Sequence, residues 1–228
     1  MAKKHAIIVL DTETCNIVPS DKVTRGNNLT YDIGYAVIYP STGEIALKSS
    51  NVVSEIFFGE REKMDTAYYA DKLPQYYTDL INGTRTLKSF FDIMNDINHI
   101  CREYNIIAIC AHNAAFDVDA LNTTVRYLTG LDYIHALPNI EIWDSMKMAK
   151  TFAKTPSYIK FCNDNHFMTA HATPRPRMTA EVLYRFITND IDFEESHTAL
   201  EDVMIEQAIV IKAYRTHKKM ERVLYDKR

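Results

Sequence analysis

The chain has 228 residues and a mass of 26.3 kDa, which fits one folded domain, with or without a small appendage. A hydrophobic fraction of 46% and a charged fraction of 25% exclude disordered, collagen-like and disulfide-scaffold sequences. The net charge of −4 disfavours binding of nucleic acid by bulk positive charge, and the six glycines form neither GxGxxG nor a P-loop.

The cysteines and the apolar stretches bear on the cellular compartment. None of the four cysteines forms a CxxC pair, and we expect free thiols in a reducing environment. There is no secretory leader pattern, and no window approaches the ~18 apolar residues of a membrane span. We therefore expect no membrane association and a location in the cytoplasm of a bacterium or of a phage-infected host. The sequence carries no signal for the oligomeric state.

The first half of the chain predicts a buried strand followed by a strand hairpin. Residues 6–10 are a continuous apolar run, typical of a strand buried on both faces. Residues 33–39 and 44–49 flank a Pro-Ser-Thr-Gly turn and predict the hairpin. Residues 52–58 either extend this strand or form a loop, and residues 60–83 predict short surface helices.

The second half predicts alternating strands and helices. The predicted strands are residues 106–111 and 140–143. The predicted helices cover residues 86–104, 113–128, 144–152, 179–188 and 198–218, with Asn113 as a cap and Gly130 as a terminator. Prolines make residues 154–178 irregular, with one short helix.

This order of elements predicts an α/β fold with a mixed five-stranded sheet and helices on both faces. We assign residues 1–211 to this domain. Residues 212–228 hold seven basic and two acidic residues, and they predict a basic C-terminal helical extension.

Two carboxylates stand at the end of the first predicted strand. Asp11 and Glu13 are two residues apart, so strand alternation places both on one side. Ligands of α/β sheets bind at strand ends, and carboxylates this close repel each other unless a cation lies between them. Oxygen ligands of this kind suit Mg²⁺. The alternative interpretation is a solvated turn.

A further carboxylate opens the helix predicted after residues 106–111. Asp117 in this first turn either belongs to a site or stabilises the helix dipole. Asp117 and Asp119 are about 200° apart on a helix, so spacing allows only one of them to face the sheet end.

The last long helix begins with a third polar group. Thr198 and Glu201 have capping-box spacing, which places His197 just before the helix and Asp202 in its first turn. Considered alone, His197 would be interpreted as a surface residue.

Three motifs stand in a family-specific order: Asp11-Thr12-Glu13, His112 to Asp117, and His197 to Asp202. Together they resemble the DEDDh 3′–5′ exonucleases, the proofreading type of the ribonuclease H-like superfamily, which includes the epsilon subunit of bacterial DNA polymerase III. Residues 31–37 and 142–146 resemble further segments of that family, so the resemblance spans roughly residues 5–211.

The resemblance implies a ribonuclease H-like fold and a Mg²⁺-dependent 3′–5′ exonuclease that releases 5′-mononucleotides from single-stranded or frayed DNA. The implied metal ligands are Asp11, Glu13, Asp117 and Asp202, which would hold two Mg²⁺ or Mn²⁺ ions, and His197 is the implied general base. The implied substrate contacts are Thr12, Thr14, Cys15, Asn16, His112, Asn113 and Phe116. The implied partners are 3′ ends of single-stranded DNA or RNA and a separate DNA polymerase.

The chain departs from the family pattern at three places. Cys15 and Asn16 follow the first motif where glycine is usual, Asp32 replaces a usual glutamate, and residues 59–83 form a longer segment. The sugar preference is therefore open, and an RNA-trimming exoribonuclease is an alternative function. A non-catalytic nucleic-acid-binding module is a second alternative, which the intact catalytic positions disfavour.

Other polar residues allow two interpretations each. The basic extension either contacts phosphates or reflects the usual cation bias at a helix C-terminus. Arg175, Arg177, Arg185, Lys154 and Lys160 either face a nucleic-acid backbone or are solvated. Cys162, His166 and His171 lack an evident fourth ligand, so a polar loop is favoured over a zinc site.

Overall fold

The computed structural model describes residues 5–19, 24–65, 67 and 69–227, and it places seven strands of this part in one sheet. The strands are β1 (Ala6–Asn16), β2 (Asn28–Tyr39), β3 (Glu44–Val53), β4 (Thr86–Lys88), β5 (Ile106–Ala111), β6 (Glu141–Asp144) and β7 (Val223–Tyr225). Their order in the sheet is β4-β3-β2-β1-β5-β6-β7. The expected five strands are present, and β4 and β7 are three-residue additions at the two edges.

The central strand β1 is longer than its apolar run predicts. Its parallel pairing with β5 ends at Val9 and Cys110, whereas its antiparallel pairing with β2 continues to Asn16. Asp11 and Glu13 therefore lie inside a strand, at the level where β5 has already ended. The pairing with β2 keeps this polar half of β1 extended.

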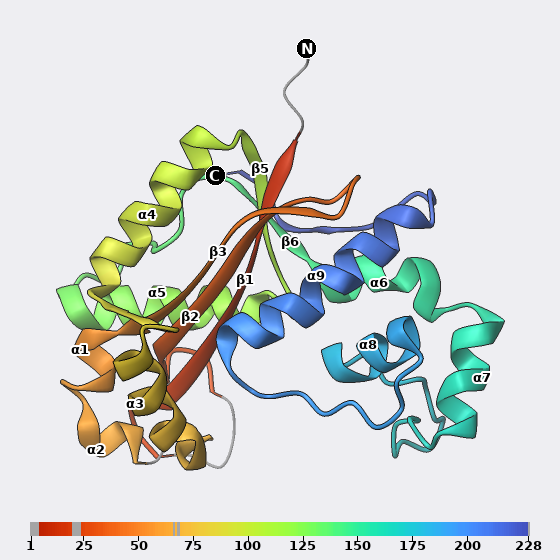
Figure 1. The fold of residues 1–228 in the computed structure, drawn as a ribbon, viewed down its shortest axis with the longest axis horizontal. Helices are drawn as coiled ribbons and strands as arrows, with labels where there is room; N and C mark the ends of the chain where they lie inside the picture. The colour runs from red at the N-terminus through yellow and green to blue at the C-terminus, as the bar shows by residue number, and fades with distance from the viewer. Residues whose placement is uncertain (1–4, 20–23, 66, 68, 228) are drawn as a thin grey trace.

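Helices cover both faces of the sheet (Figure 1). They are α1 (Ser54–Phe57), α2 (Arg61–Met64), the 3₁₀ helix η1 (Ala70–Lys72), α3 (Leu73–Asn82), α4 (Phe90–Glu103), α5 (Ala115–Thr129), α6 (Ser145–Ala153), α7 (Pro156–Asp164), α8 (Ala180–Thr188) and α9 (Ala199–Arg215). Ile8 of β1 belongs to a core with α4 and α5. Ile7 on the other face belongs to a core with α6, α8 and α9. The alternation of β1 therefore separates two apolar cores.

Local sequence explains most helix ends. Ser89 and Thr179 cap α4 and α8, each accepting a hydrogen bond from the backbone three residues on. Gly130 ends α5 in the left-handed conformation, as predicted. The predicted start of a helix at residue 86 is wrong, because residues 86–88 pair with β3 and Ser89 begins the helix.

The cap predicted at Asn113 is wrong, and Thr198 is the cap of α9 without the hydrogen bonds of a capping box. Asn113 has a φ of 60°, and the cap of α5 is Ala114, which has no side-chain hydrogen bond to the helix. The Thr198 hydroxyl donates to the Glu201 carboxylate rather than accepting from the backbone, so this pair is no capping box.

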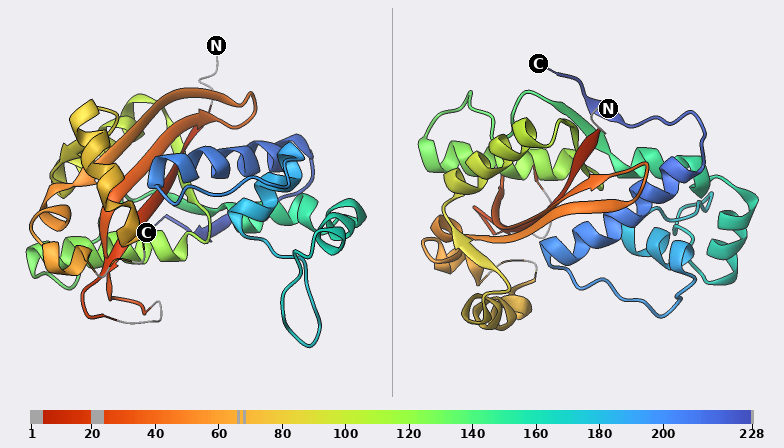
Figure 2. Two further views of the ribbon diagram at one scale, coloured as in Figure 1. Left: turned by 60° about the horizontal axis from the view of Figure 1, so that its bottom comes forward. Right: turned by 45° about the horizontal axis from the view of Figure 1, so that its top comes forward.

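The C-terminal segment differs from the predicted helix. Helix α9 ends at Arg215, and the chain then turns back and adds β7 antiparallel to β6. The rotated views in Figure 2 show this segment, in dark blue, running from the end of α9 along the edge of the sheet. No helix in the described part of the chain is both long and apolar enough to cross a membrane.

Candidate active site

Carboxylates from both ends of the chain meet where α9 packs on β1. Side chains of β1 point alternately to the two faces of the sheet. Asp11 and Glu13 follow Ile7 and Val9 at every second position, so they lie on the face of β1 that α9 covers. Asp202 comes from the first turn of α9. One carboxylate oxygen from each of the three lies within 4.8 Å of the others. Three of the four implied metal ligands therefore form a compact trio.

Asp117 lies beside this trio at the start of α5. Its Oδ1 accepts a 2.9 Å hydrogen bond from the Thr12 hydroxyl, and the residue is buried. Its charge is the largest electrostatic cause of the raised pKa of Asp11. Asp119 points elsewhere and accepts a 2.9 Å hydrogen bond from the Gly26 backbone. Of the two aspartates that spacing left open, Asp117 is the one at the cluster.

A fifth carboxylate, Glu206, belongs to the same cluster. It lies one helical turn after Asp202, is 2% exposed, and accepts a 3.1 Å hydrogen bond from the His112 backbone at Oε1. Its Oε2 is buried without a hydrogen-bond partner among the described residues. The sequence analysis missed this residue. The available signal was its four-residue spacing from Asp202, which puts both on one helix face.

Burial raises the pKa of every carboxyl group in the cluster, and mutual repulsion adds to the effect. The pKa of Glu13 rises to about 9 and that of Asp202 to about 8, each mainly through burial. Burial also raises the pKa of Asp117 to about 7, and it raises those of Asp11 and Glu206 well above their usual range. Without a cation, the cluster therefore retains protons at neutral pH.

The residues fit a hard divalent cation. Asp202 Oδ1 and Glu206 Oε2 are both buried and unpartnered within the described part of the chain. Carboxylate oxygens are the ligands that Mg²⁺ prefers, and a cation among them would replace protons and satisfy these atoms.

His197 lies on the lead-in to α9, as predicted. Its φ is 55°, and its backbone donates a hydrogen bond to the Asp202 carboxylate. Its ring stacks on Tyr69, with centroids 4.3 Å apart and planes 11° apart, and its Nδ1 is 3.9 Å from Glu195 Oε2. Burial lowers the pKa of His197, which favours the neutral form that accepts a proton. The His197 backbone therefore adjoins the cluster, and its ring is held by Tyr69.

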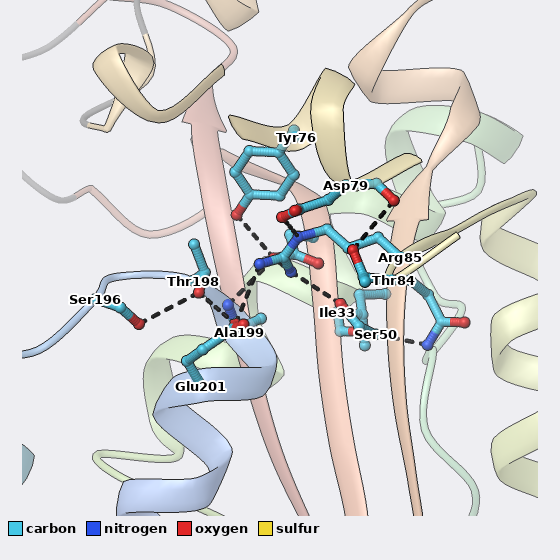
Figure 3. A network of polar contacts seen from close by, with 12 residues as sticks. Ile33, Ser50, Tyr76, Asp79, Thr84, Arg85, Ser196, Thr198, Ala199 and Glu201 are labelled. Carbon is cyan, nitrogen blue, oxygen red and sulfur yellow. Dashed lines mark hydrogen bonds and ion pairs between the residues drawn. The ribbon is translucent and has the colours of Figure 1, made fainter. Parts of the chain in front are cut away.

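A buried arginine links β2 and the segment before β4 to the start of α9 (Figure 3). Arg85 is 3.1 Å from Asp32 Oδ2 and 3.1 Å from Glu201 Oε2. The same Asp32 oxygen accepts hydrogen bonds from the Tyr76 hydroxyl at 2.8 Å and the Ala199 backbone at 3.1 Å. Asp32, the departure from the family pattern, thus holds the first turn of the helix that carries two cluster carboxylates.

Helix α9 also touches the sheet directly at a glycine. A Cβ on Gly34 of β2 would lie 2.3 Å from the backbone carbon of Ala199. Only a residue without a side chain allows this approach. Gly34 is opposite Asp11 in the β1–β2 pairing, so this contact fixes how closely α9 packs on the sheet beside the cluster.

Two of the implied substrate residues line a cleft at the start of α5, on the side of Asp119. Asn113 and Phe116 border a cleft of about 290 Å³ at the start of α5, together with Arg25 and Asn28. Thr14 and Asn16 are half-buried on β1.

The other three implied substrate residues have partners or are buried. The Thr12 hydroxyl binds Asp117, and Cys15 is buried in the core. The ring nitrogens of His112 are each 2.8 Å from a polar atom, the Ser145 hydroxyl and the Met178 carbonyl. His112 therefore anchors the chain before α8 and has no free ring nitrogen for a substrate.

No protein-family model matches the chain, and no curated protein matches its sequence. Solved structures resemble its fold. A full-length 3′-exonuclease has a TM-score of 0.60 at 13% identity, covering 95% of this chain and 84% of that one. The nuclease domain of 3′hExo, a DEDDh family member bound to rAMP, has a TM-score of 0.56 at 11% identity, covering 100% and 99%.

A zinc-bound complex of E. coli ExoI with single-stranded DNA also resembles the chain. Its TM-score is 0.53 at 14% identity, covering 94% of this chain and 41% of that one. At identities this low, the structural likeness shows the fold alone. It confirms the predicted ribonuclease H-like α/β architecture with helices on both faces of the sheet.

Proposed function

We propose that the chain is a Mg²⁺-dependent 3′–5′ exonuclease of the DEDDh type that removes 5′-mononucleotides from single-stranded or frayed DNA ends. The observation that carries the proposal is the trio of Asp11, Glu13 and Asp202 within 4.8 Å, with Asp117 beside it. The position of His197 next to Asp202 supports a general base at the same place.

The cluster has the residues that this hydrolysis needs. Asp11, Glu13, Asp117 and Asp202 would hold two Mg²⁺ or Mn²⁺ ions, which when bound make water more acidic and stabilise charge on the leaving 3′-oxygen. The neutral imidazole of His197 takes the proton of the attacking water as the bond between phosphorus and the 3′-oxygen breaks. The stacked Tyr69 ring restricts the orientation of that imidazole.

The finer assignments follow from the same proposal. The predicted domain, residues 1–211, omits the end of α9 and the strand β7, which pairs with β6 in the same sheet, so we extend the proposed exonuclease domain beyond residue 211. We propose that the enzyme acts in the cytoplasm of a bacterium or an infected host, with a DNA polymerase as a partner.

Substitution of the cluster tests the proposal. With Mg²⁺ and a 5′-labelled DNA oligonucleotide, the wild type should give products shortened from the 3′ end. Asp11→Asn and Asp202→Asn should react at least about 100-fold more slowly, because each removes a charged ligand. His197→Asn should lose about 10²- to 10⁴-fold through the missing base.

Asp96→Asn, on the exposed surface of α4, is the matched control and should keep wild-type activity. Wild-type rates in Asp11→Asn and His197→Asn would overturn the assignment. An RNA oligonucleotide of the same sequence tests the exoribonuclease alternative. A wild type that binds oligonucleotides but digests neither with Mg²⁺ nor with Mn²⁺ would be a binding module instead.

A further inference from the structure

Five lysines gather in one cleft between α6 and the segment that follows α9. The cleft has a volume of about 330 Å³. It is lined by Lys147, Lys150, Thr151, Lys154, Thr155, Lys218, Lys219 and Glu221. The sequence analysis considered the C-terminal lysines and Lys154 separately, and the fold brings them together.

The lysines converge for identifiable reasons. Lys147, Lys150 and Lys154 are spaced by three and four residues, which puts them on one face of α6. The opposite wall is fixed because β7 pairs with β6 and the Asp144 backbone donates to the Arg222 carbonyl at 2.8 Å. The chain turns back from the end of α9 to make this wall (Figure 1).

Two lysines tie the walls of the cleft together. Lys147 Nζ is 3.0 Å from the Val223 carbonyl, and Lys218 Nζ is 3.1 Å from the Thr151 carbonyl. Each of these ammonium groups carries further donors. The cleft is therefore held by its own lysines.

The charge in the cleft is opposite to that of the whole chain. Five positive side chains face one acidic residue in a protein with a net charge of −4. Glu221 is 4.0 Å from Lys147 and 3.7 Å from Lys150, at the limit of ion pairing. Lys147 lies in the first turn of α6, where the helix dipole disfavours a cation. Helix-end bias therefore does not explain Lys147, which faces the same cleft as the lysines at the two helix C-termini.

The cleft leads away from the candidate active site. Asp144 caps α6 and accepts a 3.2 Å hydrogen bond from the backbone of Asn113. The preceding residue, His112, donates its backbone hydrogen bond to Glu206 of the cluster. From there α6 rises about 1.5 Å per residue, so Lys147 to Lys154 spans about 10 Å. Lys147 is thus about one turn from that end, and Lys154 is farther out.

We infer that the lysine cleft binds the phosphodiester backbone of the substrate strand, upstream of the 3′ end at the carboxylate cluster. This inference rests on the proposed function. Lysine ammonium groups bind phosphates without reading the base, which is what an enzyme that advances along any sequence requires. The cleft also explains how an acidic chain retains a polyanion.

A triple charge substitution tests the inference. Lys150→Gln, Lys154→Gln and Lys219→Gln together remove three charges and leave the wall contacts of Lys147 and Lys218 intact. The matched control is Lys48→Gln, Arg61→Gln and Arg102→Gln, three exposed basic residues that do not line the cleft. Fluorescent twenty-nucleotide oligo(dT) and oligo(U) are titrated in EDTA, where no hydrolysis occurs, across a range of salt concentrations.

The cleft variant should bind both long probes about 10-fold more weakly at low salt. Its plot of log affinity against log salt should lose about 2 from the slope, because each phosphate contact on a single strand contributes about 0.7. A dinucleotide, whose single phosphodiester is the bond that is cleaved, has no upstream phosphate for the cleft and should be hydrolysed at the wild-type rate when Mg²⁺ is added. The control variant should show a smaller loss and the wild-type slope.

An unchanged slope, an equal loss in the control, or a loss confined to one of the two long probes would overturn the inference. These outcomes are read from binding alone, whereas the proposed function is read from hydrolysis. A wild type that binds with a steep salt slope but does not cleave would contradict the proposed function and leave the cleft assignment standing.

Discussion

Glu206 shows how one residue changes the balance of the cluster. Its two oxygens have different surroundings, since Oε1 accepts the His112 backbone hydrogen bond and Oε2 is buried and unpartnered among the described residues. In the metal-free protein this carboxyl group adds to the burial and repulsion that raise the pKa of Asp11. With cations present, the same negative charge would attract them.

Glu206→Gln should separate these two effects. The amide keeps the shape and can still accept from His112, but it removes the charge. We expect Mn²⁺ affinity to fall about 10-fold or more, as for groups that support a metal site. The free energy of unfolding in EDTA at neutral pH should be close to that of the wild type, because the raised pKa of Glu206 keeps the wild-type side chain protonated and uncharged there. Calorimetric titration and urea unfolding measure the two quantities.

Glu103→Gln, exposed on α4, is the control and should change neither quantity. Unchanged Mn²⁺ affinity in Glu206→Gln would show that this carboxylate does not act on bound cations. A large loss of stability in EDTA would show that its role is packing.

At the scale of elements, the site depends on how α9 is docked on β2. Gly34 permits the close approach, and Arg85 joins Asp32 to the first turn of α9. Both partners of this ion pair are buried, with Arg85 4% exposed and Asp32 0% exposed. Removing one partner of such a pair leaves an uncompensated buried charge, which is more costly than removing both.

Arg85→Met should therefore lower the free energy of unfolding by about 3–5 kcal/mol. It should also slow hydrolysis, because the start of α9 loses its link to Asp32. The double variant Arg85→Met with Asp32→Asn should recover much of the stability, since no buried charge is left unpaired. Urea unfolding of the two single variants and the double variant gives the coupling. Equal stability of Arg85→Met and the double variant would refute a buried charge pair.

Elements long enough to show the apolar pattern typical of a strand or a helix could be predicted from the sequence. The strand predicted at residues 106–111 coincides with β5, and the helix predicted at residues 179–188 coincides with α8 except for its first residue. The edge strands β4 and β7 could not be predicted, because three residues hold no period and their pairing partners are distant in sequence. For the same reason, Thr86 to Lys88 looked like the start of a helix.

The motif residues of the site could be predicted, but their supports could not. Asp11, Glu13 and Asp202 lie together as the resemblance implied. Arg85, Tyr69 and Glu206 carry no motif, and their roles arise from contacts across the fold. His112 matched the motif, yet its ring is used to hold the chain before α8.

For the whole molecule, the raised pKa values predict how stability depends on pH. In the metal-free protein Glu13 titrates at about 9 and Asp202 at about 8, whereas unfolded carboxyl groups titrate near 4. The folded state therefore holds more protons between these values, and stability falls as pH rises. Below about pH 6.5, the lowered pKa values of His112 and His197 have the opposite effect, because the unfolded state then binds more protons at these residues and stability rises with pH.

The free energy of unfolding in EDTA should thus decline between about pH 6.5 and about pH 9. Each shifted carboxyl group adds up to about 1.4 kcal/mol per pH unit to the slope within its range. Saturating Mg²⁺ should reduce or reverse the decline, because cations bind the ionised carboxylates. Urea unfolding at a series of pH values, with and without Mg²⁺, measures both. Stability that is flat or rising in EDTA over this range would contradict the raised pKa values.

The distance in sequence between β1 and α9 has a consequence for the order of folding. The antiparallel strands β1, β2 and β3 are consecutive in sequence, so their pairing closes only short loops. Docking of α9 against β1 closes a loop that contains most of the chain. Closing a loop of this length lowers the conformational entropy of the chain before the contacts of α9 can stabilise the closed form. We therefore expect this docking to be a slow and late step of folding. A partly folded chain with α9 undocked carries Asp11 and Glu13 without Asp202. We therefore expect full cation affinity to appear when α9 docks and adds Asp202 and Glu206, so the timing of metal uptake during refolding should report that event.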